Sequence, residues 1–154
     1  MTTTHTGPPK IDFVSRRILQ PVIAGLTNLG LSIWGSRVLE APGRTTGTIR
    51  RVPVNLLTID GQDYLVAPRG HTNWVRNVRA NDGRLTLKLG RRRTPHQATE
   101  LADADKEPVL RAYLARWKFE VGAFFDGVDA DSPSEELARI APSHPVFALA
   151  PLPR

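Results

Sequence analysis

The chain has 154 residues, of which 40% are hydrophobic and 23% charged. This composition is typical of a globular protein and excludes collagen-like, rod-like and wholly disordered chains. There is no cysteine, which excludes disulfides, thiolate metal sites and a cysteine nucleophile, and the four histidines show no metal-ligand spacing, so we expect no metal site. The length predicts a single domain over residues 13–154, after a polar tail at residues 1–12 that we expect to be flexible.

The formal net charge of +6 is distributed unevenly along the chain. Residues 44–93 carry eleven basic and three acidic side chains, whereas residues 94–154 carry six basic and ten acidic ones. Ten of the eleven central cations are arginines, whose planar fork of donors matches phosphate and carboxylate groups. The middle of the chain is therefore expected to bind a polyanion, such as nucleic acid, lipid headgroups or an anionic cofactor.

Residues 13–39 form an apolar region with no charge between Arg17 and Arg37. The region contains too many polar residues and glycines for a transmembrane helix, and it predicts one or two helices packed on the domain. The alternative is an interfacial helix that gives peripheral membrane contact through residues 13–39. The first interpretation places the protein in the cytoplasm, and the alternative places it at the inner face of the membrane.

Alternating and turn-forming residues dominate the next part of the chain. Residues 46–68 predict a β-hairpin that turns at Asp60-Gly61, and Pro53, which has no N–H, is expected at an edge or bulge. A short helix is predicted over residues 72–80, with Thr72 as its cap and Trp74, Val75 and Val78 facing inward. Strands are predicted at residues 85–89 and 92–101.

The last third predicts two helices and a strand. Apolar residues recur at helical spacing over residues 105–126, and a capping box beginning at Ser132 predicts a helix over residues 132–141. A strand is predicted at residues 146–150. This order of elements indicates an α+β fold with a mainly antiparallel sheet that can close into a barrel.

Two segments have the composition of anion-binding loops. In the first, Gly43 to Pro53, two glycines bracket threonines with arginines on both sides, which suits a phosphate cradle but is not a Walker loop. In the second, Ala67 to Asn77, an Arg-Gly loop opens the short helix, whose first N–H groups can face an anion. Each pattern alone is weakly specific.

Together, the two segments resemble the deazaflavin-dependent nitroreductase family of flavin/deazaflavin oxidoreductases, and the resemblance runs from about Ala41 to Leu101. It implies a split β-barrel of the FMN-binding split-barrel type, with helices at both ends of the chain. It also implies coenzyme F420, a 5-deazaflavin with a phosphodiester and a polyglutamate tail. The implied activity is hydride transfer between the reduced deazaflavin and a hydrophobic acceptor, either a quinone, a nitro compound or an unsaturated lipid.

The resemblance also implies a set of cofactor-binding residues. They are Arg44, Thr45, Thr46, Arg50, Arg51, Val52, Pro53, Val54, Asn55, Val66, Ala67, Pro68, Arg69, Asn73, Trp74, Val75, Arg76 and Asn77. The family often has Lys where Thr45 stands and Ser-Lys where Pro68-Arg69 stand.

The sequence leaves the catalytic residues and several alternatives open. Tyr64, His71 and solvent are alternative proton donors, and Trp117, Phe124 and Phe125 are either acceptor-site walls or helix core, with the core favoured for Trp117. An FMN- or haem-binding split barrel and a non-catalytic F420 carrier are the alternative functions. A nucleic-acid partner is disfavoured because the basic region has few aromatic residues and the last third is acidic. We expect a small hydrophobic acceptor as the partner and a monomer or homodimer.

Overall fold

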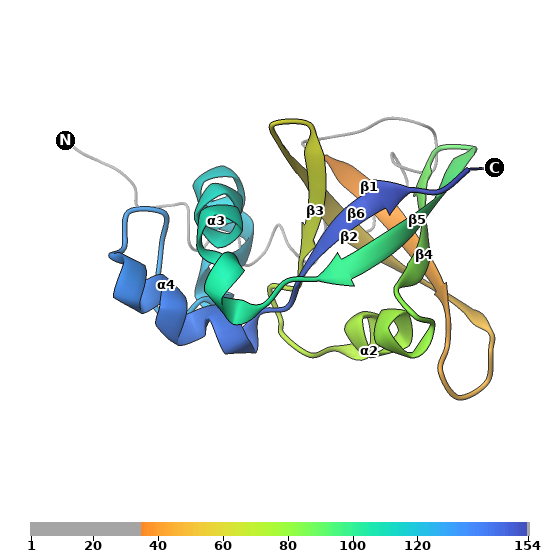
Figure 1. Ribbon diagram of the computed structural model, residues 1–154, viewed down its shortest axis with the longest axis horizontal. Helices are drawn as coiled ribbons and strands as arrows, with labels where there is room; N and C mark the ends of the chain where they lie inside the picture. The colour runs from red at the N-terminus through yellow and green to blue at the C-terminus, as the bar shows by residue number, and fades with distance from the viewer. Residues whose placement is uncertain (1–34, 154) are drawn as a thin grey trace.

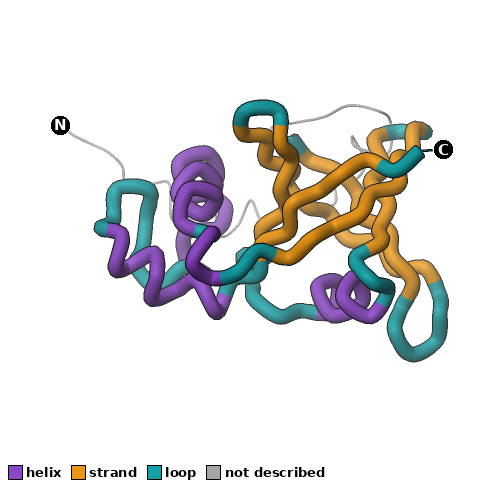
Figure 2. The backbone as a smooth tube through the Cα atoms, viewed as in Figure 1, coloured by secondary structure: helices purple, strands orange, loops and turns teal. Residues whose placement is uncertain are grey.

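The computed structural model describes residues 35–153. Six strands close into an antiparallel barrel in the order β1-β2-β3-β6-β5-β4 (Figures 1 and 2), which confirms the predicted α+β fold and its mainly antiparallel sheet. The strands are β1 (Ser36–Pro42), β2 (Ile49–Ile59), β3 (Gln62–Val66), β4 (Arg84–Leu89), β5 (Arg92–Glu100) and β6 (Val146–Pro151). The α-helices are α2 (Asn73–Ala80), α3 (Glu107–Val121) and α4 (Ser134–Ile140), and the single 3-10 turns are η1 (Asp103–Asp105), η2 (Gly122–Phe124) and η3 (Ala141–Ser143).

The tight turn between β2 and β3 explains the register of the predicted hairpin. Asp60 and Gly61 have φ angles of 49° and 81°, and Ile59 and Gln62 on either side of them pair directly. A two-residue loop with both central φ angles positive matches the right-handed twist of the strands. The hairpin prediction is therefore confirmed.

The long strand β2 changes its partner halfway along. Residues 49–55 pair with β1, and residues 56–59 pair with β3. Within residues 35–153, no strand pairs with the second edge of residues 49–55, so the barrel wall is split at this point. Pro53 lies in this singly paired half, as predicted for a residue that cannot donate to a ladder on both sides.

Alternation along the strands produces two apolar layers. Inward-facing residues such as Leu39, Leu65 and Phe147 fill the barrel together with Val75 and Val78 of α2. The opposite faces of β2, β3 and β6 pack against α3 and α4, which lie together beside the barrel while α2 lies across one end (Figure 1). The split in the wall lies between these layers, so a ligand there can contact both.

Part of the predicted helical region 13–39 is a strand, and this prediction was wrong for residues 36–39. Residues 36–42 form β1, which pairs with β2 on one edge and β4 on the other. Leu39 and Ala41 then alternate into the barrel core, and this gain outweighs any helical preference of the segment. Residues 13–34 and the predicted tail 1–12 lie outside the described residues.

The helix boundaries differ from the predicted ones for local reasons. The predicted capping box is wrong, because Pro133 occupies the N-cap of α4 and the Ser132 hydroxyl instead accepts from the Asp129 N–H at 2.9 Å. Thr72 is the N-cap residue of α2, but its side chain makes no capping bond. The α-helical part of residues 105–126 is shorter than predicted, and it kinks at Trp117, where φ is −122° and ψ is 21°.

Candidate cofactor site

The split in the barrel wall opens into a cleft of about 780 Å³. Ligand pockets of this size hold molecules of a few hundred daltons. The cleft is lined by Ser36, Leu39, Ala41, Gly43, Arg44, Thr45, Thr46, Arg50, Arg51, Val52, Pro53, Val54, Asn55, Val66, Pro68, Arg69, Thr72, Asn73, Trp74, Asn77, Tyr113 and Phe124. All but three of the predicted cofactor-binding residues are thus brought together: Ala67 and Val75 are core residues, and Arg76 is exposed on α2 away from the lining.

The turn between β1 and β2 forms one end of the cleft. The Gly43 N–H donates to the Thr48 carbonyl at 2.7 Å, and the Gly47 N–H donates to the Gly43 carbonyl at 2.9 Å. Gly47 has a φ of 78°, which a residue with a side chain rarely adopts. These bonds close the turn tightly, with Arg44, Thr45 and Thr46 on the cleft side.

A buried asparagine fastens this turn to α2. The Oδ1 atom of Asn77 accepts from the Arg44 backbone N–H at 3.1 Å and from Arg44 Nη1 at 2.8 Å. The other terminal nitrogen, Arg44 Nη2, donates to Asn73 Oδ1 at 3.2 Å. Asn77 is only 4% exposed, so the guanidinium of Arg44 is held in one direction at the edge of the cleft. The cation keeps its full charge, because both partners are neutral amides.

A second arginine of the cleft is oriented by a buried carboxylate. Glu40, which is 7% exposed, accepts from Arg51 Nε at 2.7 Å and from Arg93 Nε at 3.0 Å. Burial alone would raise the pKa of Glu40, but the hydrogen bonds from Arg93 and Arg51 outweigh it and hold the pKa below its usual range. Since both arginines donate through Nε, the terminal nitrogens of Arg51 stay available to a ligand in the cleft.

The loop between β3 and α2 carries Arg69 into the cleft. The guanidinium of Arg69 lies 5.0 Å from the centre of the Phe124 ring, a cation–π distance. His71 supports the loop from outside: its Nδ1 accepts from Arg79 at 3.1 Å, so its Nε2 carries the proton and donates to the Pro142 carbonyl at 3.0 Å.

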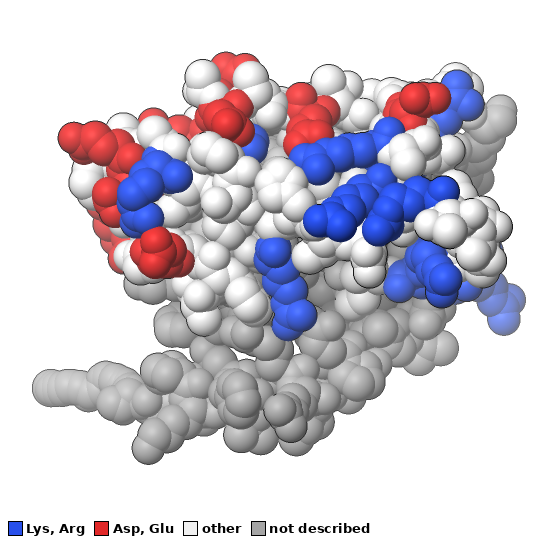
Figure 3. Space-filling model, turned by 90° about the horizontal axis from the view of Figure 1, so that it is seen from below, with Lys and Arg blue, Asp and Glu red and all other residues white. Residues whose placement is uncertain are grey.

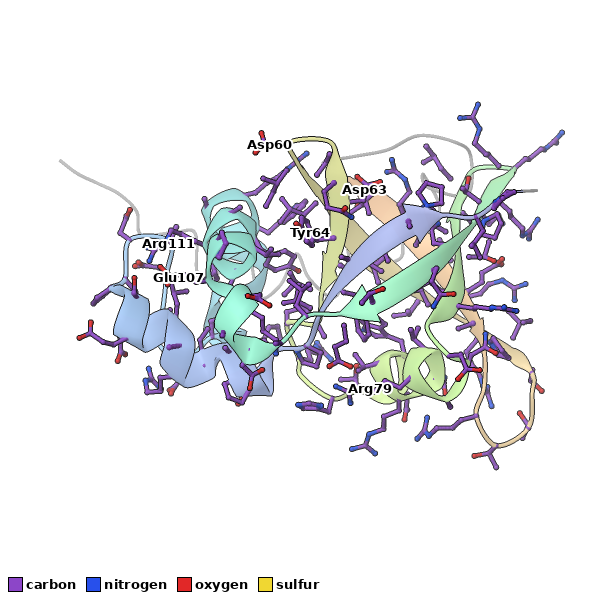
Figure 4. All side chains as sticks on the ribbon, in the orientation of Figure 1. Asp60, Asp63, Tyr64, Arg79, Glu107 and Arg111 are labelled. Atoms are coloured by element: carbon purple, nitrogen blue, oxygen red, sulfur yellow. The ribbon has the colours of Figure 1, made fainter. Side chains whose placement is uncertain are left out.

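Arg79 in turn pairs in bidentate fashion with Glu100, at 2.8 and 2.6 Å. This bond raises the pKa of Arg79 and lowers that of Glu100, so the pair is fully charged at neutral pH and anchors His71. Figure 4 shows Arg79 projecting from α2 below the barrel.

The alternatives left open for the acceptor site and the proton donor are now resolved in part. Phe124 lines the cleft, whereas Trp117 and Phe125 are buried in the outer core, with exposed fractions of 1% and 0%, and do not. Tyr64 packs between β3 and α3 (Figure 4) and does not line the cleft. Neither does His71, whose two ring nitrogens are already bonded to Pro142 and Arg79.

Several lining residues were missed by sequence reasoning. Tyr113 is 2% exposed and reaches the cleft from α3, yet in the sequence it was one more apolar position of a helical repeat. Ser36, Leu39 and Ala41 were missed because β1 was not predicted as a strand. Thr72 was recognised only as a helix cap.

The charge division of the sequence persists on the surface. Figure 3 shows Lys and Arg gathered over the barrel and α2, and Asp and Glu mostly over α3 and α4. Residues 35–153 contain no group of three His, Cys, Asp or Glu side chains that could hold a metal ion. No helix in this part of the chain has the length and apolar character needed to cross a membrane.

The open-sided barrel with an arginine-rich cleft at its split defines the class of the protein: it is a split-barrel oxidoreductase that binds an anionic redox cofactor. More specifically, the chain belongs to the F420H(2)-dependent quinone reductase family, whose model matches residues 24–121. The resemblance inferred from the two loop segments is confirmed, and coenzyme F420 is the cofactor.

Solved structures share the fold at low sequence identity. An F420-H2 dependent reductase (FDR-A) matches at 20% identity over 75% of this chain and 94% of that one, with a TM-score of 0.52. A structure described as a domain-swapped dimer matches at 20% identity over 92% and 99% of the chains, with a TM-score of 0.55. Atu2129 of Agrobacterium tumefaciens, of unknown function, matches at 15% identity over 82% and 52%, with a TM-score of 0.54. No curated protein matches the chain in sequence.

Proposed function

We propose that the cleft binds F420 with its anionic part against the β1–β2 turn and its ring along β2, and that the enzyme reduces a hydrophobic, quinone-type acceptor. The observation that carries this proposal is the fixed guanidinium of Arg44, which two neutral asparagines hold at the cleft edge without cancelling its charge. When bound, F420 supplies the hydride, a chemistry that no side chain provides.

The residues present fit an elongated anionic ligand with a planar ring. Arg44 lies in the β1–β2 turn and Arg50 and Arg51 lie at the start of β2, and each can donate two parallel bonds to phosphate or carboxylate oxygens. Val52 and Val54 face the interior of the barrel and offer an apolar surface. The unpaired edge of residues 49–55 adds backbone N–H and C=O groups, which a ring with amide-like edges can bond.

The apolar side of the cleft supports a hydrophobic acceptor. Trp74 comes from α2, Tyr113 from α3 and Phe124 from η2, so three separate elements line the cleft with rings. Trp74 is held by Phe147 at a ring separation of 5.8 Å. These rings exclude water from a bound acceptor, and aromatic surfaces are favourable partners for flat quinone rings.

The cofactor arrangement is tested with arginine variants and a matched control. We expect Arg44→Ala and Arg50→Ala each to weaken F420 binding about tenfold or more, because each removes a charge-assisted bond to the anionic part. Arg76→Ala is the control. Arg76 belongs to the second loop segment and is exposed, but it does not line the cleft. Quenching of F420 fluorescence gives the dissociation constants. Equal constants in all four proteins would disprove the arrangement.

The acceptor class is tested by turnover of reduced F420. We expect oxidation of the reduced cofactor to be faster with a quinone than with a nitro compound or an unsaturated lipid, and Tyr113→Leu to raise KM for the quinone. FMN is titrated in parallel as the alternative cofactor. Tight F420 binding without turnover of any acceptor would support the carrier alternative instead.

The assembly and cellular location are separate proposals. The match with the structure described as a domain-swapped dimer covers 99% of that chain, which supports a homodimer of this one. Light scattering after size exclusion measures the mass directly, and a monomer at micromolar concentration would contradict it. Peripheral membrane contact through residues 13–39 stays a prediction, since most of that region lies outside the described residues.

A further inference from the structure

Two arginines of the cofactor cleft are held in place by different kinds of partner. Arg44 is held by the amide oxygens of Asn73 and Asn77, which leave its charge intact. Arg51 is held by the carboxylate of Glu40, whose Oε2 accepts from Arg51 Nε at 2.7 Å. A carboxylate at this distance orients the guanidinium, but it also cancels most of the charge that an anionic ligand would feel. Arg51 would therefore be a poor anion ligand if Glu40 had no other partner.

Arg93 is that other partner. Its Nε donates at 3.0 Å to Oε1 of Glu40, so each carboxylate oxygen of Glu40 bonds one arginine. Arg93 comes from β5, two strands away from β1: Glu40 pairs with Thr86 of β4, and Lys88 of β4 pairs with Arg93. Arg93 does not line the cleft and lies outside the predicted cofactor-binding set, so its contact with Glu40 is its only described link to the site.

The burial of Glu40 makes the sharing of its charge important. Glu40 is 7% exposed, whereas the side chains of Arg51 and Arg93 are 56% and 52% exposed. Burial raises the pKa of Glu40, but the hydrogen bonds from Arg93 and Arg51 hold it below its usual range, so the carboxylate is ionised at neutral pH. Two guanidiniums and one carboxylate leave one net positive charge on the group. Without Arg93, Glu40 and Arg51 would form a neutral pair.

We propose that Arg93 is a positioning residue of the cofactor site: by sharing Glu40, it restores the positive charge that Arg51 presents to the anionic part of the cofactor. This inference rests on the proposed function in that Arg51 contacts F420. It extends the binding machinery from the cleft to strand β5, through a residue that does not touch the ligand.

The test uses charge compensation in the full chain. Arg93→Gln leaves Glu40 paired with Arg51 alone, so we expect F420 binding to weaken about fivefold or more. When Glu40→Gln is added, the buried negative charge is removed, and its amide oxygen can still accept from Arg51 Nε. The double variant should therefore bind F420 within about twofold of the natural protein. Quenching of F420 fluorescence at about pH 8, where carboxylates are ionised, gives the dissociation constants.

Two further variants are the controls. Arg92 is exposed, makes no hydrogen bond or ion pair with the described residues, and faces the opposite side of β5 from Arg93. Arg92→Gln removes the same charge from the adjacent position, and screening by salt should keep its effect on F420 affinity below about twofold. Arg93→Lys keeps the charge and a donor for Glu40, so it should bind F420 like the natural protein.

A second measurement does not depend on the cofactor. Inorganic phosphate is titrated into the protein without F420 while the Nε–H signal of Arg51 is followed by 1H–15N NMR. Arg93→Gln should raise the phosphate concentration that gives half of the shift, and adding Glu40→Gln should lower it again. If the natural protein bound phosphate in this way but did not bind F420, the proposed function would fail while the role of Arg93 stood.

Several results would overturn this role. Equal F420 and phosphate affinities in Arg93→Gln and the natural protein would show that Arg51 does not depend on Arg93. A loss that Glu40→Gln does not reverse would show that Arg93 only supports the β4–β5 hairpin, and an equal loss in Arg92→Gln would show a general effect of charge. If Arg93→Gln failed to fold, Glu40→Gln alone would decide: it should bind F420 at least as tightly as the natural protein, and weaker binding would contradict the inference.

Discussion

Replacing Asn77 separates two contributions of the cofactor site, the geometry of Arg44 and its charge. In Asn77→Ala the Oδ1 atom disappears, and with it the bonds to the Arg44 N–H and to Arg44 Nη1. A neutral bond contributes about 1 kcal/mol and one from a charged donor about 1.5–3 kcal/mol. Arg44 is exposed, so water replaces part of both bonds. We expect a loss of about 1.5–2 kcal/mol in unfolding free energy, which lowers Tm by about 3–8 °C.

The same change should weaken F420 binding by about tenfold, since the turn that carries Arg44 must then be ordered by the ligand. Asn77→Asp provides the contrast. Its carboxylate accepts the same two bonds, so stability should be kept or raised, but its charge neutralises Arg44, so F420 affinity should fall at least as far as in the Ala variant.

Thermal unfolding followed by circular dichroism and fluorescence quenching by F420 give both quantities for each variant. The reasoning is refuted if Asn77→Ala changes neither Tm nor affinity, because the bonds would then not hold the turn. It is also refuted if Asn77→Asp binds F420 more tightly than the natural protein, because the group facing Arg44 would then not be an anion.

Three further predictions concern other parts of the site and the strands that support it. Because the pKa of Glu40 is lowered in the folded protein, its contribution to stability is present above about pH 4.3 and is lost as the pH falls through the folded pKa. Urea unfolding at pH 3–6 should therefore show a decline in stability toward acid pH that is smaller in Glu40→Gln. Parallel pH profiles of the two proteins would contradict this. Gly83→Ala places a Cβ against the Ala98 carbonyl at a φ of 80° and should lower the unfolding free energy by about 2–3 kcal/mol. Gly61→Ala, where the φ is 81° but the space is open, should lower it by about 1 kcal/mol. Equal losses in denaturant titrations would show that only the backbone strain matters and not the contact with Ala98. His71→Gln should keep the F420 affinity, because its amide can both accept from Arg79 and donate to the Pro142 carbonyl. His71→Ala should lower the affinity several-fold by loosening the loop that carries Arg69. Equal dissociation constants in fluorescence titrations of the two variants would show that His71 does not support this loop.

Turn-forming residues predicted most of the barrel, because the conformation of a short hairpin turn depends on adjacent residues. The Asp60-Gly61 pair fixes a two-residue loop by its own backbone preference, so the hairpin and its register follow from adjacent residues. Strand β1 was missed for the opposite reason. Its partners β2 and β4 lie later in the chain, and only these paired neighbours on both edges make the segment a strand.

The residues of the candidate site likewise fall into those that the sequence predicted and those that it did not. Residues 43–55 and 66–77 were recognised because each forms a compact loop motif within the sequence, and most of them line the cleft. Tyr113 was not recognised, since its helical spacing is that of a core residue and its position at the cleft depends on how α3 packs on the barrel. The roles of Tyr64 and His71 also required the structure, because side-chain partners such as Arg79 are not visible in spacing.

The split in the barrel wall explains why these separate motifs form one site. If β3 continued beside residues 49–55, backbone pairing would close the wall and the arginines of β2 would lie on an ordinary outer surface. Instead the chain leaves the sheet after Val66, turns through the Arg69 loop and enters α2, whose Asn77 then meets the β1–β2 turn. The same departure that leaves β2 unpaired therefore also delivers the residues that orient Arg44. Within this fold, opening the wall and building the anion site are consequences of a single change in chain direction.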